Sequence, residues 1–201
     1  MTRTKSTYVS GPAHIYAHQQ NKLGQMQCGD RYAIITRTNF SLFVIADGLG
    51  SGPGAAESSR TVIDVIKGNA DIPLDQLVKE CNHHLLYKRG AALAIMKLWH
   101  DSKRVEYVSI GNVRLYIYPT TGKVIYPLST TGYLSGRPFP YKVHTMVLDE
   151  GTRFLLYSDG FQFPSSKLVT ESPLSFEITV NDLFTRYATE KDDATLLAGI
   201  M

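Results

Sequence analysis

Short runs of β-branched and aromatic residues, separated by turn-forming residues, make up most of this sequence. Such runs predict β-strands, at residues 13–18, 31–36, 41–47, 91–99, 105–110, 113–118, 123–126, 142–148, 153–157 and 194–200. Only residues 55–67, 73–86 and 174–187 have the apolar spacing of an amphipathic helix. Because these helices are set apart from the strands, we predict an α+β fold with antiparallel sheets packed face to face and helices outside. The strands between residues 91 and 157 are expected to form an antiparallel meander.

Size and composition limit the class of protein. The chain has 201 residues, and neither a repeat nor a linker interrupts it, so we predict one domain over residues 1–201. Its apolar runs are far shorter than the roughly 20 residues of a membrane helix, and its first residues lack the apolar core of a secretory signal. Cys28 and Cys81 have neither a metal-ligand spacing nor the number needed for a disulfide framework. We therefore expect a cytoplasmic protein with no membrane partner.

The charge pattern gives no sign of nucleic-acid binding. Lys and Arg number 21 against 18 Asp and Glu, so the formal net charge is only +3. The basic residues are scattered, and the densest groups are pairs such as Lys88-Arg89. A basic patch would be needed to hold a phosphate backbone, so nucleic acid is not an expected partner.

Four aspartates occupy the same kind of position, at the edge of an apolar strand and next to glycine or a second aspartate. They are Asp30, Asp47, Asp159 and Asp192. A single aspartate in such a place is usually a turn former. In an antiparallel sandwich, however, strand ends from distant parts of the chain converge at one edge. Four such aspartates together therefore predict a cluster of carboxylates.

Carboxylates held together in a cleft favour bound cations. Like charges repel one another, and burial disfavours the ionised form. Oxygen ligands without Cys or His favour Mg²⁺ or Mn²⁺ over Zn²⁺, and the number of carboxylates matches two ions per chain, about 3.5–4 Å apart. Gly48 can turn its carbonyl toward an ion, and the glycine-rich loop after it is open to a substrate phosphate. That loop lacks the Lys-Ser/Thr of a Walker motif, which argues against nucleotide binding.

The order of these motifs resembles a known family. Asp30, the loop 47–52, the segment 158–160 and the segment 192–195 follow one another as in the metal-dependent Ser/Thr phosphatases of the PP2C type. Within that superfamily the chain is most similar to the compact bacterial branch with SpoIIE and RsbU. Segments 46–52, 88–91, 111–114 and 132–136 resemble, more narrowly, the feedback phosphatases of the stressosome. The resemblance implies an αββα sandwich with a binuclear Mn²⁺/Mg²⁺ site between the sheets.

The resemblance also implies a role for each metal ligand. Asp47 would bridge both ions, and Asp159 and Asp192 would complete the coordination of one of them. Asp30 and the Gly48 carbonyl would serve the other. A bridging water, ionised near neutral pH, would attack the phosphorus in line with the departing seryl or threonyl oxygen.

Other residues are expected around these ligands. Asp193 points to the opposite face from its neighbour, so we expect it to support the ligands or to cap a turn. Asn112 stands where many relatives have Asp, which gives no support to a third ion, and we expect it near the phosphate together with Gly50 and Ser51. Leu49 stands where many relatives have His, so a histidine general acid is not expected.

Larger members of the family bind phosphate through an N-terminal arginine, and this sequence has no clear counterpart of it. Either Arg89 or Arg114 would substitute, although each is equally well explained as a solvated surface charge. The sequence leaves that choice open.

The resemblance implies a protein phosphoserine/phosphothreonine phosphatase. Its expected substrates are phosphorylated STAS-domain proteins of the stressosome (RsbS/RsbR type), on which it would act as a monomer in negative feedback on the bacterial general stress response. Two alternatives remain open. The chain would also fit a catalytically inactive module that binds a partner, or a phosphatase for a small-molecule phosphoester.

Overall fold

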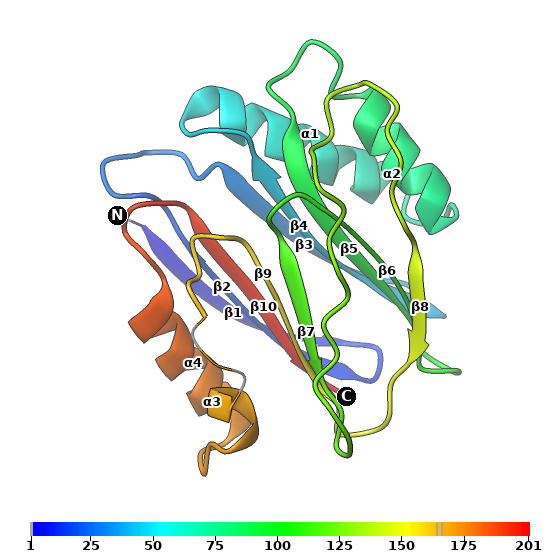
Figure 1. Ribbon diagram of the computed structural model, residues 1–201, viewed down its shortest axis with the longest axis vertical. Helices are drawn as coiled ribbons and strands as arrows, with labels where there is room; N and C mark the ends of the chain where they lie inside the picture. Colours follow the sequence, from blue (N-terminus) through cyan, green and yellow to red (C-terminus); the bar gives the residue numbers. More distant parts are fainter. Residues whose placement is uncertain (1, 164, 166) are drawn as a thin grey trace.

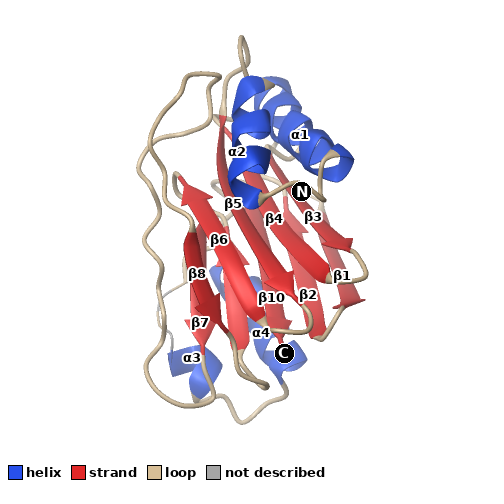
Figure 2. Cartoon of the chain, turned by 90° about the vertical axis from the view of Figure 1, so that its right-hand side faces the viewer, coloured by secondary structure: helices blue, strands red, loops and turns tan. Residues whose placement is uncertain are grey.

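The computed structural model describes residues 2–163, 165 and 167–201. Two five-stranded antiparallel sheets pack face to face, with helices on their outer faces (Figures 1 and 2). Sheet A has the strand order β1-β2-β10-β9-β7, and sheet B has the order β3-β4-β5-β6-β8. This arrangement confirms the predicted α+β class and αββα sandwich. The elements are β1 (Arg3–Ser10), β2 (Ala13–Gln20), β3 (Asp30–Thr36), β4 (Phe40–Gly48), α1 (Pro53–Gly68), α2 (Leu74–His83), β5 (Ala91–Trp99), β6 (Arg104–Ile110), β7 (Arg114–Tyr118), β8 (His144–Val147), β9 (Arg153–Tyr157), α3 (Lys167–Thr170), α4 (Phe176–Tyr187) and β10 (Ala194–Ile200).

The alternation of side chains along β4 shows how the layers are held together. Phe43 and Ile45 point between the two sheets, where the Phe43 ring lies 5.5 Å from the ring of Phe154 in β9. Leu42 and Val44 point to the other face and pack in the cluster that includes α1 and α2. Because both faces of this strand are buried, its sequence is a continuous apolar run.

Each sheet carries its own helices. The buried faces of α1 and α2 pack on sheet B, and that of α4 packs on sheet A. Pro53 begins α1, where a proline is tolerated because the first turn has no internal acceptor for its N–H. The last helix begins later than the predicted residue 174, because the Ser175 hydroxyl caps it by accepting a hydrogen bond from the Ile178 N–H at 3.4 Å.

The predicted meander is wrong. The strand β6 pairs with β8 in sheet B, whereas β7 pairs with β9 in sheet A, so the chain crosses between the sheets at Gly111-Asn112. The predicted strand 123–126 is reduced to a bridge between Ile125 and Ile117. The sequence interpretation also missed β1, because most of its side chains are exposed and polar at the edge of sheet A.

A long irregular segment, residues 125–136, runs across the edges of both sheets, and we call it the strap. Three bridges hold it, from Ile125 to β7, from Thr130 to the end of β6 and from Leu134 to the start of β5. At its end, the Asn82 side chain of α2 accepts hydrogen bonds from the Ser135 and Gly136 N–H groups, both at 3.0 Å. The strap therefore has a defined position although it is not a regular strand.

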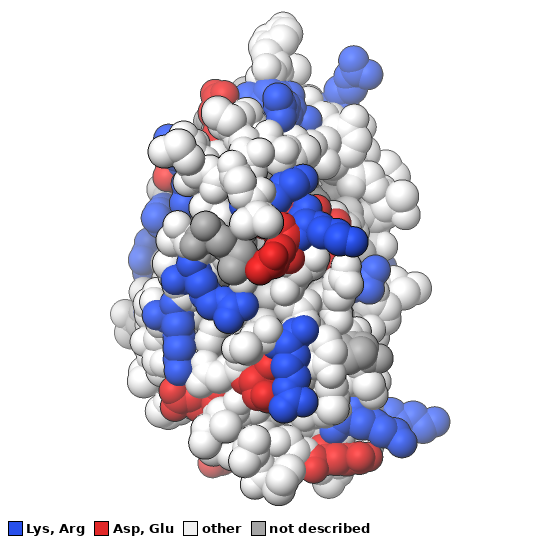
Figure 3. All heavy atoms as spheres, turned by 90° about the vertical axis from the view of Figure 1, so that its left-hand side faces the viewer, with Lys and Arg blue, Asp and Glu red and all other residues white. Residues whose placement is uncertain are grey.

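Charges of both signs are mixed on the face that lies to the left in Figure 1, as Figure 3 shows. The pair of Lys5 in β1 with Glu177 in α4, at 3.4 Å, is an example of opposite charges from neighbouring elements. Among the residues that the structure describes, none of the helices combines the length and the apolar character needed to cross a bilayer.

The buried side chain of His18 leads us to predict that the protein becomes less stable as the pH falls. Its ring is 4% exposed and lies 5.1 Å from the Phe184 ring. Burial is the main reason that the pKa of His18 is lowered to about 4. The positive charges of Lys5 and Arg3 lower the pKa further, and the opposing effect of the Glu177 charge is smaller. The unfolded chain takes up this proton near pH 6.5, so the contribution to stability is complete above that pH and is lost as the pH falls toward 4.

We expect this group alone to remove about 2–3 kcal/mol of unfolding free energy between pH 7 and pH 4. Chemical denaturation of the protein and of His18→Phe across this range measures the effect. The difference in unfolding free energy between the two proteins should shift in favour of the variant as the pH falls. An unchanged difference would contradict the prediction.

Candidate metal centre

The four predicted aspartates come from four strand ends at one edge of the sandwich. Asp30 opens β3, Asp47 lies near the end of β4, and the two residues face each other directly in the register of these strands. Asp159 follows β9 by two residues, and Asp192 precedes β10 by two residues. Because β9 and β10 are paired neighbours in sheet A, the fold brings both sheets' aspartates to the same edge.

The carboxylates act on one another electrostatically. Burial, followed by the negative charges of Asp159 and Asp192, raises the pKa of Asp47 to about 7. Burial, followed by the charge of Asp47, raises the pKa of Asp30 well above its usual value. Burial also raises the pKa of Asp192, and the charge of Asp159 adds to it. Such a site is unfavourable as a set of bare anions and is stabilised by cations.

Asp30 provides an independent test of whether the site suits a cation. The side chain is 1% exposed, and its Oδ2 accepts a hydrogen bond from the Ser158 hydroxyl at 2.6 Å. The Ser158 oxygen in turn accepts one from the Thr195 N–H at 2.9 Å. The other carboxylate oxygen of Asp30, Oδ1, is buried without a partner. A buried acceptor with no donor beside other carboxylates fits a metal ion.

The oxygens do not converge on one point as the side chains stand. Within residues 2–163, 165 and 167–201, no three Asp, Glu, His or Cys side chains form a ready metal cage. The Asp159 carboxylate instead accepts a hydrogen bond from the Asn112 amide at 2.6 Å. Ligation would therefore require the carboxylates to turn toward the ion, and the proposed coordination remains a prediction.

Asp193 follows the candidate ligand Asp192, and its carboxylate holds two backbone segments in place. Its two carboxylate oxygens accept hydrogen bonds from the N–H groups of Lys22 and Gly29, each at 2.8 Å. These contacts fasten the segment that leads into Asp30. A supporting role for Asp193 at a metal site stays a prediction. The sequence interpretation missed Ser158, which links Asp30 to β10; its place directly before the Asp159-Gly160 pair was the available signal.

The glycine-rich loop, residues 48–52, is needed because α1 lies very close to the end of β4. A Cβ on Gly48 would lie 2.0 Å from the backbone oxygen of Ala55, so only glycine fits there. Gly50 and Gly52 have φ angles of 85° and 77°, which glycine adopts without strain. Together these residues fold the loop back over the end of β4, beside Asp47.

The two candidate arginines have different surroundings. Arg89 donates a hydrogen bond from Nη1 to the Ser51 carbonyl at 3.1 Å, and a Cβ on Gly54 would lie 2.6 Å from its Nε. Arg89 is therefore packed on the glycine loop and fastens it. Arg114, at the start of β7, is exposed and lines a hollow together with Asp159.

A sequence model of the family described as "Stage II sporulation protein E (SpoIIE)" matches residues 39–167, which is more than half of the chain. The phosphoserine phosphatase RsbX of Bacillus subtilis (strain 168) is 34% identical over 182 residues, covering 90% of this chain and 92% of RsbX. This chain belongs to the SpoIIE family of PP2C-type phosphatases. The SpoIIE/PP2C family predicted from the motifs is thereby confirmed, and within it the chain is similar to RsbX.

Solved structures agree with this assignment. A crystal structure of RsbX in complex with magnesium superimposes with a TM-score of 0.92 at 32% identity, covering 98% of this chain and 99% of RsbX. The catalytic domain of the serine/threonine phosphatase PstP, crystallised with two manganese ions, has a TM-score of 0.72 at 18% identity, over 94% of this chain and 97% of PstP. The second likeness shows the shared fold. As a member of the SpoIIE family, the chain is an enzyme, a phosphatase of the PP2C type.

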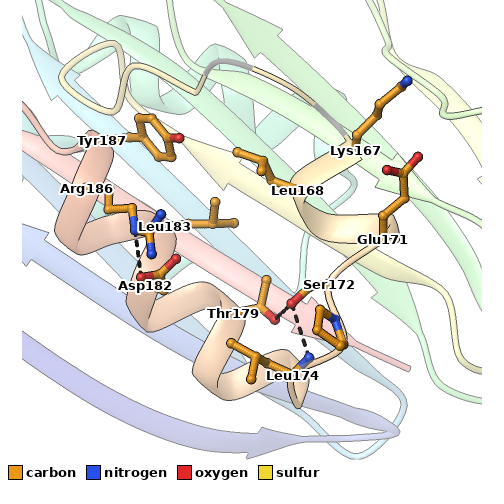
Figure 4. A pocket seen from close by; sticks show the side chains of 11 residues that line it. Lys167, Leu168, Glu171, Ser172, Leu174, Thr179, Asp182, Leu183, Arg186 and Tyr187 are labelled. Atoms are coloured by element: carbon orange, nitrogen blue, oxygen red, sulfur yellow. Dashed lines mark hydrogen bonds and ion pairs between the residues drawn. The ribbon is translucent and has the colours of Figure 1, made fainter.

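A separate pocket of about 340 Å³ lies between α3 and α4, outside sheet A (Figure 4). Its charged side chains include Arg186 and Asp182, which form an ion pair at 2.8 Å. None of the predicted site residues lines it. The predicted phosphatase site is therefore separate from this pocket.

Proposed function

We propose that this SpoIIE-family phosphatase is a metal-dependent protein phosphoserine/phosphothreonine phosphatase that dephosphorylates STAS-domain proteins of the stressosome (RsbS/RsbR type). It would act in negative feedback on the bacterial general stress response. The observation that carries the chemistry is the gathering of four carboxylates, with a buried orphan oxygen on Asp30, at one edge of the sandwich. Similarity to the phosphoserine phosphatase RsbX along 90% of the chain supports the substrate class.

The proposed cofactor is two ions per chain, Mn²⁺ or Mg²⁺. Structures of RsbX with magnesium and of PstP with two manganese ions support the proposed metal dependence. Asp30, Asp47, Asp159, Asp192 and the Gly48 carbonyl would hold them. When bound, such ions lower the pKa of water and offset the charge of a phosphoryl group.

The remaining site residues would act on the substrate and on the ligands. Asn112 lies at the carboxylates and donates to Asp159, so it would set the orientation of that side chain or contact the phosphoryl group. Gly50 and Ser51 keep the loop beside Asp47 open for the phosphate. Arg89 holds that loop in place. We further propose that the phosphatase domain spans residues 1–201 and works as a monomer in the cytoplasm.

Metal dependence is the first test of this proposal. With Mn²⁺, the purified protein should release phosphate from a phosphoserine peptide and from the phosphorylated STAS-domain protein. Excess EDTA should lower the rate at least about a hundredfold, and added Mn²⁺ should restore it. A phosphate-release assay measures both.

Turnover that continues unchanged in EDTA would contradict the metal mechanism. A rate on nucleotides or sugar phosphates that exceeds the rate on the phosphoprotein would favour a small-molecule substrate. Isothermal titration that detects no Mn²⁺ binding, together with no turnover, would favour an inactive binding module.

A further inference from the structure

A groove of about 520 Å³ lies between the strap and the carboxylate edge. Its lining includes Leu49, Asn112 and Arg114, together with Tyr126, Leu128 and Thr131 of the strap. Asn112 joins the groove to the metal centre, because its amide donates to Asp159. A substrate whose phosphoryl group reaches the carboxylates would therefore extend over this groove.

The floor of the groove depends on a glycine. Gly111 lines the groove with a φ of 90°, and a Cβ there would lie 2.6 Å from the Cβ of Ala92 and 3.1 Å from the Gly132 carbonyl. Gly111 also lies where the chain crosses between the sheets, and its N–H donates a hydrogen bond to the Thr130 carbonyl of the strap at 2.8 Å. The groove is thus bounded by segments that bridges and hydrogen bonds hold in place.

The groove has one charge and it is positive. Arg114 is the charged residue among those that line the groove, and no carboxylate is among them. In the described part of the chain, Arg114 is in no ion pair. An exposed guanidinium without a carboxylate partner is suited to an anionic group that comes from outside.

Two of the residues that line the groove are apolar and exposed. Leu128 is 72% exposed and Tyr126 39%, and both belong to the strap. Exposed apolar side chains at a groove are typical of a surface that contacts another polypeptide. The volume also exceeds what a phosphoryl group alone would fill, so the groove has room for side chains next to the phosphorylated residue.

We propose that this groove binds the polypeptide on either side of the phosphorylated residue, and that Arg114 selects substrates with an acidic side chain there. Leu128 and Tyr126 would contact the apolar parts of the same segment. The inference rests on the proposed phosphatase function and deepens it, because it makes Arg114 a specificity residue for a protein substrate.

The test compares three short phosphoserine peptides that differ only in the residues flanking the phosphoserine, which are glutamate, glutamine or lysine. The protein with Mn²⁺ should have a kcat/KM for the glutamate peptide about three- to tenfold above that for the glutamine peptide. Arg114→Gln should abolish this preference, and Arg114→Glu should reverse it in favour of the lysine peptide. Arg60→Gln, which removes an exposed arginine of α1, is the matched control and should keep the preference.

p-Nitrophenyl phosphate, which has no flanking residues, separates the two roles open to Arg114. If Arg114→Gln lowers kcat/KM for this ester as much as for the glutamate peptide, Arg114 binds the phosphoryl group and the proposal is wrong. Equal rates on all three peptides, or a preference that survives in both Arg114 variants, would also overturn it.

A binding measurement keeps the inference testable if the chain proves to have no activity. Fluorescence anisotropy of the labelled peptides with Asp47→Asn, and with Asp47→Asn combined with Arg114→Gln, reports the groove without turnover. Tighter binding of the glutamate peptide that is lost in the double variant would support the groove even if the phosphatase function failed. The same affinity for all peptides would reject it.

Discussion

Phosphatase activity is expected to fall at least about a thousandfold when Asp47 is replaced by asparagine. Asp47 faces Asp30 across β3 and β4, and the charges of Asp159 and Asp192 act on it. It is therefore the one carboxylate that neighbours all the others, as a bridging ligand must be. Asparagine keeps the size of the side chain but removes one anionic ligand oxygen.

Phosphate release from a phosphoserine peptide at saturating Mn²⁺ measures this loss. Asp64→Asn, in which an exposed aspartate of α1 is changed in the same way, is the control and should retain full activity. A variant Asp47→Asn that keeps more than about a tenth of the activity would contradict the role of Asp47 as a shared ligand.

The same substitution should stabilise the metal-free fold. In EDTA at pH 8, the Asp47 carboxylate is ionised, buried and close to other carboxylates, and each of these conditions disfavours the folded state. Removing its charge should raise the unfolding free energy by about 1–3 kcal/mol, as measured by urea denaturation. Lower activity together with higher stability distinguishes loss of a ligand from misfolding.

Gly48→Ala is expected to destabilise the protein by about 2–4 kcal/mol and to abolish measurable activity. The new Cβ would lie 2.0 Å from the Ala55 oxygen and 2.6 Å from its carbonyl carbon, which are backbone atoms of α1. Backbone cannot move away as a flexible side chain can, so α1 and the end of β4 must separate. That separation would displace Asp47 and the glycine loop together.

Thermal and urea denaturation measure the loss of stability, and the phosphate assay measures the activity. Gly68→Ala at the end of α1 is the matched control, because a Cβ there meets nothing within 4 Å. It should leave both properties unchanged or raise the stability slightly. A Gly48→Ala protein as stable and as active as the parent would show that α1 does not depend on this close approach.

Local patterns in the sequence were enough for most of the elements. The apolar run of β4 and the helical spacing of α1 each reflect which faces of the segment are buried. Side chains return to the same face every two residues in a strand and every 3.6 residues in a helix, so the pattern is visible in the sequence. The strand β1 escaped prediction because an exposed edge strand carries no apolar period. The predicted strand 123–126 was wrong because Ile125 forms a single bridge, which does not make a strand.

The candidate site was predicted in its residue types and in their order along the chain. An aspartate at a strand end next to glycine is a local feature, and four of them in the order found in PP2C-type phosphatases identified the family. The contact between Asn112 and Asp159 was not visible in the same way, since the two residues lie far apart in the sequence. Nor could the sequence separate Arg89, which donates a hydrogen bond to the glycine loop, from Arg114, which lines a hollow with Asp159.

The sequence by itself thus determined most of the elements, the fold class and the family, because burial and turn formation act over a few residues at a time. Only the tertiary structure decided which strands pair, that β6 joins β8 while β7 joins β9, and that a groove opens where the chain crosses between the sheets. Strand pairing depends on contacts between segments far apart in the chain. The free energy of those contacts cannot be predicted from the spacing of apolar residues within any one segment.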